Sequence, residues 1–183
     1  MIKKIIDFIV SLFCKTPKED KDIPMAEPKI TKEELERAGD PITQEFQDAF
    51  NTFFEKINIF REKCGLPMSP TSYFRSKERQ LRIYREKAEK HEFPFEDGIF
   101  KESKVPMGSA HMSGLACDFA DANKKLANWV LDNIDWCKDN GYYFENFGAD
   151  INTYERDKKY DKTPQWIHIQ ILPPKSGRII FNP

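Results

Sequence analysis

The sequence predicts an α+β fold in which a small antiparallel sheet is flanked by helices. Segments with helical spacing and segments with strand alternation come in mixed order along the 183 residues, without the regular alternation of a parallel α/β sheet. Hydrophobic residues make up 39% of the chain and include fifteen Phe, which is enough for a substantial core. A chain of this length accommodates one compact domain and a terminal extension.

The predicted elements follow the periodicity of the apolar residues. The clearest is a helix over Thr43–Cys64, in which aromatic and aliphatic residues recur every three or four positions until Gly65 ends it. Capping-box spacing between Thr31 and Glu34 predicts a short helix before it. The remaining elements are a strand at Thr71–Phe74, a helix at Ser76–His91, a loop over residues 92–108, a helix at Lys124–Asn140, and strands at Tyr142–Phe144 and Trp166–Leu172.

The N-terminal part of the chain differs from the rest. Residues 1–15 form an apolar, amphipathic stretch that is too short to span a bilayer, which needs about 20 residues. Two readings stay open: an interfacial helix on a membrane surface, or a helix packed on its own domain or on a partner. Residues 16–30 are charged, contain three prolines and are predicted to be a linker. The functional site is therefore expected in a folded domain over residues 31–183.

Charge and cysteine content argue against two classes of protein. Lys and Arg (29) nearly balance Asp and Glu (30), so no broad positive field favours nucleic acid as a partner. The four cysteines lack Cys-x-x-Cys spacing, and we expect free, mostly buried thiols in place of a disulfide framework.

Two compact motifs contain two of the three histidines of the chain. His111 and Asp118 are seven residues apart, and Gly114 between them permits a close turn. His168 alternates with apolar residues, as on a strand that is buried on one side. Two imidazoles and one carboxylate suit zinc and leave one coordination position open for water. The sequence therefore predicts a metal site, and a metal-dependent hydrolase is the first hypothesis.

These motifs resemble a known family. The pattern Ser-x-His-x-x-Gly-x-Ala-x-Asp at residues 109–118, followed by Trp-x-His at residues 166–168, is similar to that of the zinc D-Ala-D-Ala carboxypeptidases and L-alanyl-D-glutamate endopeptidases. Members of that family cleave bacterial cell-wall peptides and include phage endolysins. Residues 72–76 resemble a further block of the family, and residues 173–183 resemble the tails of small phage-encoded members. The resemblance implies their fold, to which the zinc-binding domain of Hedgehog proteins is distantly related.

The resemblance also implies roles for individual residues. By position in the motifs, His111, Asp118 and His168 would hold the zinc ion. Arg75, in the block at residues 72–76, would stabilise the oxyanion that forms on the substrate.

The general base is where the chain departs from the family. Many members carry Asp or Glu three residues before the last histidine, whereas this chain has Gln165, which cannot accept a proton at neutral pH. Glu145 resembles the Glu that other members carry at the end of the preceding strand, and it is the predicted acid/base. Asp161, or no base at all, stays open as the alternative.

The predicted function is hydrolysis of a peptide bond in the peptidoglycan stem peptide by a zinc peptidase that uses water as nucleophile. The alternatives are a zinc-containing domain that binds wall peptide without cutting it, which Gln165 favours, and a structural protein of a phage particle. We expect a monomer that acts in the periplasm or cell wall, either released from the host cytoplasm at lysis or attached to a membrane surface through residues 1–15. The sequence leaves exo- and endopeptidase action open.

Overall fold

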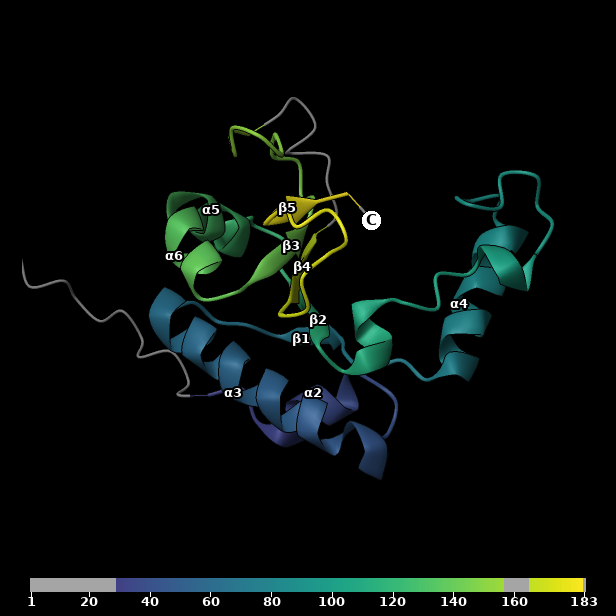
Figure 1. The fold of residues 1–183 in the computed structure, drawn as a ribbon, viewed down its shortest axis with the longest axis horizontal. Coiled ribbons are helices and arrows are strands. Elements are labelled where there is room, and N and C mark those ends of the chain that lie inside the picture. The colour runs from purple at the N-terminus through teal and green to yellow at the C-terminus, as the bar shows by residue number, and fades with distance from the viewer. Residues whose placement is uncertain (1–28, 157–164, 183) are drawn as a thin grey trace, which may run out of the picture.

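The computed structural model describes residues 29–156 and 165–182 (Figure 1). The predicted N-terminal helix, nearly all of the predicted linker and Asp161 lie outside these residues. Ile30 is fully buried in the core, so the packed domain begins one residue inside the range that we assigned to the linker. No helix in the described part of the chain combines the length and apolar character needed to cross a membrane.

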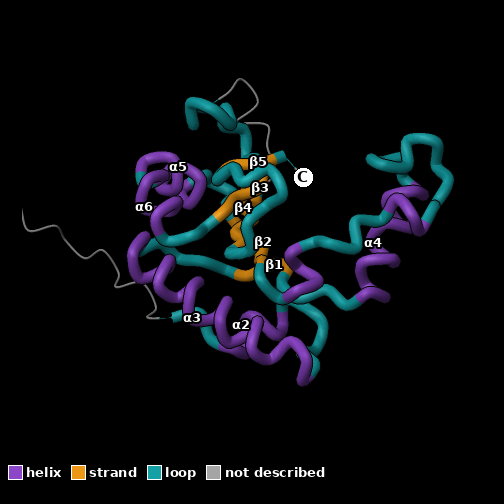
Figure 2. The backbone as a smooth tube through the Cα atoms, viewed as in Figure 1, coloured by secondary structure: helices purple, strands orange, loops and turns teal. Residues whose placement is uncertain are grey.

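Five strands form one sheet, with helices on both sides, so the predicted α+β class is confirmed (Figure 2). The strand order is β1-β2-β4-β3-β5. The strands are β1 Pro70–Ser72, β2 Ala116–Ala120, β3 Tyr143–Glu145, β4 Trp166–Gln170 and β5 Ile180–Phe181. The helices are α2 Lys32–Arg37, α3 Gln47–Cys64, α4 Lys77–Glu89, α5 Lys125–Asp132 and α6 Ile134–Asp139, with 3-10 turns at Gln44–Phe46, Glu102–Lys104 and Ala110–Ser113.

The pairing of β1 with β2, of β2 with β4 and of β3 with β4 is antiparallel, as predicted. The sequence did not predict β5, which pairs parallel to β3 and makes the edge of the sheet mixed. This strand has two residues, which is too short for any alternation to be visible in a sequence.

The two faces of the sheet differ in chemistry. Apolar residues at alternate positions of β2 and β4 are buried in the core, which they share with α3, α5 and α6. Figure 1 shows these three helices on one side of the sheet, while α4 stands apart on the other. Asp118, His168 and Gln170 lie on the second face, which we call the polar face. Because Asp118 pairs with His168 across β2 and β4, the side chains of these two residues point the same way.

Helix α3 anchors the core as the periodicity predicted. Phe50, Phe53, Ile57 and Phe60 recur at helical spacing and are all buried against the sheet and the other helices. The helix ends at Gly65, which adopts a left-handed conformation with a φ of 63° that glycine tolerates without strain.

The single helix predicted over Lys124–Asn140 is wrong, because the structure has two helices that meet at Asn133. The side-chain amide of Asn133 donates to the carbonyl of Trp129 at 2.8 Å, and its backbone has φ −126° and ψ 29°. Asn competes in this way with regular helix hydrogen bonding. The apolar positions of α5 and α6 stay in the core nonetheless, since Val130 and Cys137 are fully buried.

Helix α4 and residues 90–108, which we call the α4 unit, have a small core of their own. Ala88, Phe95 and Val105 are buried there. The partly buried residues packed against them are Leu81, Tyr84 and Phe100. Leu81, Tyr84 and Ala88 of α4 thus contribute to this small core, which is separate from the main one.

Candidate metal centre

Local backbone geometry places His111 and Asp118 at the polar face of the sheet. His111 lies in the 3-10 turn Ala110–Ser113, and Gly114 then adopts a φ of 71° that reverses the chain into β2. Asp118 is the central residue of β2, and its register partner on β4 is His168. The turn that we expected at Gly114 is therefore present, and it is what brings the first imidazole back towards the carboxylate.

The three side chains converge on one point. Ligand atoms of His111, Asp118 and His168 all lie within 4.8 Å of one another. His168 Nδ1 is 2.9 Å and His111 Nε2 is 3.3 Å from the same oxygen, Asp118 Oδ1. The residues are 3%, 8% and 5% exposed, so the cluster is shielded from bulk water. Of the described residues, these three form the one group of His, Cys, Asp and Glu that could hold a metal ion.

Hydrogen bonds on the outer side of each ring fix the tautomers. His111 Nδ1 is 2.8 Å from the carbonyl oxygen of Tyr73, which only accepts, so this nitrogen carries the proton. His168 Nε2 is 3.0 Å from Gln170 Oε1, and the amide nitrogen of Gln170 donates to the carbonyl of Leu172. When the rings are neutral, the inner nitrogens, His111 Nε2 and His168 Nδ1, therefore present lone pairs to the centre, which is how metal-binding histidines are oriented.

This donor set fits a divalent cation. Burial lowers the pKa of His111 and so favours the neutral imidazole that metals bind. Burial also disfavours the charged form of Asp118, but hydrogen bonds with His111 and His168 outweigh it and hold the pKa of this carboxyl well below its usual range. Burial also lowers the pKa of His168, but the carboxylate of Asp118 outweighs burial and raises the pKa of this imidazole above its usual value. The centre therefore holds an ionised carboxylate between two imidazoles, and a metal competes with a proton for His168.

Arg75 lies next to the cluster. Its Nη2 donates to Asp118 Oδ2 at 3.1 Å, and its Nε and Nη2 both reach Ser72 Oγ. The backbone N–H of Arg75 donates to the carbonyl of His111, which ties the two predicted site residues together. No partner for Nη1 of Arg75 is found among residues 29–156 and 165–182, so two N–H groups of the guanidinium stay available beside the centre.

Glu145 ends β3, on the same face of the sheet as His168. The register pairs Phe144 with Ile169 on the apolar face, so Glu145 and His168 share the polar one. Burial raises the pKa of Glu145, and its carboxylate interacts electrostatically with His168, Asp118, Lys87 and Arg75. Gln165, by contrast, is exposed and lies one residue before β4.

Two groups that orient the histidines of the centre were not predicted from the sequence. The Tyr73 carbonyl that orients His111 is a backbone group, which a sequence pattern does not reveal. Gln170 had a visible signal, since it alternates with His168 on β4, but its role as the acceptor for His168 was not predicted.

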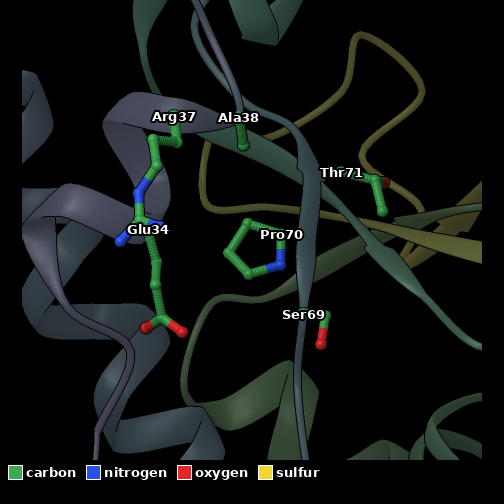
Figure 3. Close-up of a pocket in the computed structure, with 6 residues that line it drawn as sticks. All are labelled: Glu34, Arg37, Ala38, Ser69, Pro70 and Thr71. Atoms are coloured by element: carbon green, nitrogen blue, oxygen red, sulfur yellow. The ribbon is translucent and has the colours of Figure 1, made fainter.

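A hollow elsewhere on the molecule contains none of the predicted site residues. It opens at the outer edge of β1 and is lined by Glu34, Arg37, Ala38, Ser69, Pro70 and Thr71 (Figure 3).

Fold and site together define the protein as an α+β domain with a candidate single-metal centre. The sequence model of the family described as VanY, D-alanyl-D-alanine carboxypeptidase, matches residues 41–167, and the chain belongs to this family. The match covers well over half of the chain, includes Arg75, His111, Asp118 and Glu145, and ends one residue before His168. No curated protein and no solved structure matches the chain.

The contact between Gln170 and His168 gives a prediction for metal affinity. Replacing Gln170 with Leu keeps the approximate volume but removes the acceptor for His168 Nε2. We expect the affinity for zinc to fall about 10–100-fold, the usual effect of losing a group that orients a ligand. Competition with a chromogenic chelator measures it, and Gln165→Leu, a change at an exposed position nearby, is the control. Unchanged affinity in Gln170→Leu would show that Gln170 does not orient the imidazole.

Proposed function

We propose that this protein hydrolyses a peptide bond in the stem peptide of peptidoglycan, with a zinc ion held by His111 Nε2, Asp118 and His168 Nδ1. The observation that carries the proposal is the convergence of these three groups within 4.8 Å, with the outer nitrogen of each imidazole already committed to a carbonyl oxygen. Membership in a family of D-alanyl-D-alanine carboxypeptidases supports the substrate class. Zinc supplies Lewis acidity in such a site, since it lowers the pKa of a water molecule to about 7 and polarises the amide carbonyl.

We propose that Glu145 is the acid/base that transfers a proton from the attacking water to the leaving amine. A carboxylate accepts the proton of the attacking water and later gives it to the amine that leaves. Burial raises the pKa of Glu145, which brings this carboxyl closer to the pH at which an acid and base must both be available. Its position beside the charges of His168 and Asp118 puts it within the electrostatic reach of the centre.

Arg75 is proposed to stabilise the oxyanion. One edge of its guanidinium is held by Asp118 and Ser72, so the group is already oriented before substrate binds. The N–H groups of Nη1 then donate to the oxygen on which negative charge develops. A donor fixed in advance costs no reorganisation during the reaction.

Metal removal and restoration test the proposal. The substrate is a stem pentapeptide that ends in D-Ala-D-Ala, and mass spectrometry reports which bond is cut. We expect no cleavage after dialysis against a chelator and release of terminal D-alanine after one equivalent of zinc is restored. Equal cleavage with and without metal would contradict zinc dependence, and a zinc-loaded protein that leaves every bond of the peptide intact would contradict peptidase function.

A further inference from the structure

Residues 38–40, which follow helix α2, lie along residues 73–76, which connect β1 to α4. The N–H of Asp40 donates to the carbonyl of Phe74 at 3.0 Å. The two backbones approach so closely that a Cβ at Gly39 would lie 2.7 Å from the nitrogen of Phe74, which is inside van der Waals contact. A shift of one segment is therefore transmitted to the other, because no flexible side chain separates them.

The carboxylate of Asp40 bonds to the start of α4. Its Oδ2 accepts from the backbone N–H of Ser76 at 2.8 Å, and its Oδ1 accepts from Nη1 of Arg79 at 3.3 Å. Ser76 is the N-cap of the helix, and the N–H groups at a helix start have no partner within the helix. Asp40 thus holds the chain on both sides of Arg75, through Phe74 before it and Ser76 after it.

The segment that is held in this way makes three contacts with the candidate metal centre. The N–H of Arg75 donates to the carbonyl of His111 at 3.1 Å, and the guanidinium donates to Asp118, also at 3.1 Å. The carbonyl of Tyr73 accepts from His111 Nδ1. The position of residues 73–76 therefore sets where the guanidinium lies relative to the metal ligands.

Asp40 itself is outside the centre. In the part of the chain that the structure describes, the hydrogen bonds of its side chain go to Ser76 and Arg79, and none goes to a predicted metal ligand. Any effect of this carboxylate on the reaction must therefore pass through the backbone of residues 73–76.

We propose that Asp40 is a positioning residue, which fixes the backbone on both sides of Arg75 and so places the guanidinium for the oxyanion. The inference rests on the proposed function, in which Arg75 stabilises that charge, and deepens it by assigning the group that keeps the donor in place. Donors of this kind must be aligned before the reaction, and a misplacement of about 1 Å can cost about 10²-fold in rate.

The test is a double-mutant cycle in zinc-loaded protein with a D-Ala-D-Ala peptide. In Asp40→Ala we expect kcat to fall about tenfold or more, with little change in KM and with zinc content intact. In an Arg75→Ala background the same change should cost little more, because the group that Asp40 positions is gone. Asp40→Asn, whose amide oxygen still accepts from the N–H of Ser76, should retain much of the wild-type rate. The control is Asp48→Ala, which removes an exposed carboxylate from the first turn of another helix, α3.

A purely structural role of Asp40 gives a different result. Asp40→Ala would then lower the melting temperature, while kcat per zinc-loaded molecule stayed at the wild-type value, and the inference would be wrong. Equal losses from Asp40→Ala with and without the arginine would also overturn it, since the two residues would then act independently.

A phosphinate analogue of the peptide separates this inference from the proposed function. Its tetrahedral oxygens resemble the oxyanion, so its binding reports the placement of Arg75 without any cleavage. If the wild type cut nothing, the peptidase would be refuted. Positioning by Asp40 would still be supported by phosphinate binding about tenfold weaker in Asp40→Ala but not in the Arg75→Ala background, and equal affinity in the wild type and Asp40→Ala would refute it.

Discussion

Replacing His111 with Ala is expected to abolish stoichiometric zinc binding and to lower kcat/KM for a D-Ala-D-Ala peptide by about 10³-fold or more. The imidazole is 3% exposed and its Nε2 points at Asp118 Oδ1, so alanine leaves the centre with one nitrogen and one carboxylate. A metal that polarises the substrate contributes several kcal/mol to the transition state, and each 1.36 kcal/mol corresponds to a factor of ten in rate. Metal content by mass spectrometry and peptide kinetics measure the two effects.

The third histidine provides the matched control. His91 is exposed in the α4 unit, and His91→Ala should keep one zinc ion per chain and near-normal kinetics. If His111→Ala retained the metal and the activity of the wild type, the assignment of this residue as a ligand would be wrong.

Replacing Glu145 with Gln is expected to lower kcat by about 10²–10⁴-fold while zinc binding stays intact. The range is the usual contribution of general acid–base catalysis. An amide of the same shape cannot take the proton from water or return it to the leaving amine. Because Glu145 is outside the three-residue cluster, its loss should leave the metal site assembled. Steady-state kinetics together with metal analysis separate the two effects.

Two comparisons decide the identity of the base. Glu89→Gln, a change at an exposed position of α4, should have the kinetics of the wild type. Full activity in Glu145→Gln combined with a large loss in Asp161→Asn would transfer the role to Asp161. A wild type that binds zinc and wall peptide but cuts nothing would instead favour the binding domain that Gln165 suggested.

The elements that the sequence predicted well are those with many periodic residues. The end of helix α3 was predicted to the residue, because its 18 residues carry a long apolar stripe and are followed by Gly65. Its start was predicted at Thr43, four residues early, since residues 44–46 form a 3-10 turn before the helix begins at Gln47. The break at Asn133 was not predicted, since it depends on one side-chain hydrogen bond to Trp129 inside an otherwise continuous pattern. The parallel pairing of β5 depends on long-range contacts of two residues, for which local periodicity carries no information.

The candidate site, too, was predicted only in part: its residues were predicted, but the contacts between them were not. The sequence pointed to His111, Asp118 and His168 because each is in a compact motif with a clear local geometry, and the structure brings the three together. The contact between Arg75 and Asp118 joins residues 43 apart, and only the folded chain reveals it.

The most direct test of the central claim is an anomalous difference map from crystals of the zinc-loaded protein, recorded on both sides of the zinc absorption edge. We expect one strong peak per chain, about 2.0–2.2 Å from His111 Nε2, an oxygen of Asp118 and His168 Nδ1, with a further position left for water. A map without a peak between these three residues, or with zinc bound elsewhere while the cluster stays closed by its own hydrogen bonds, would contradict it.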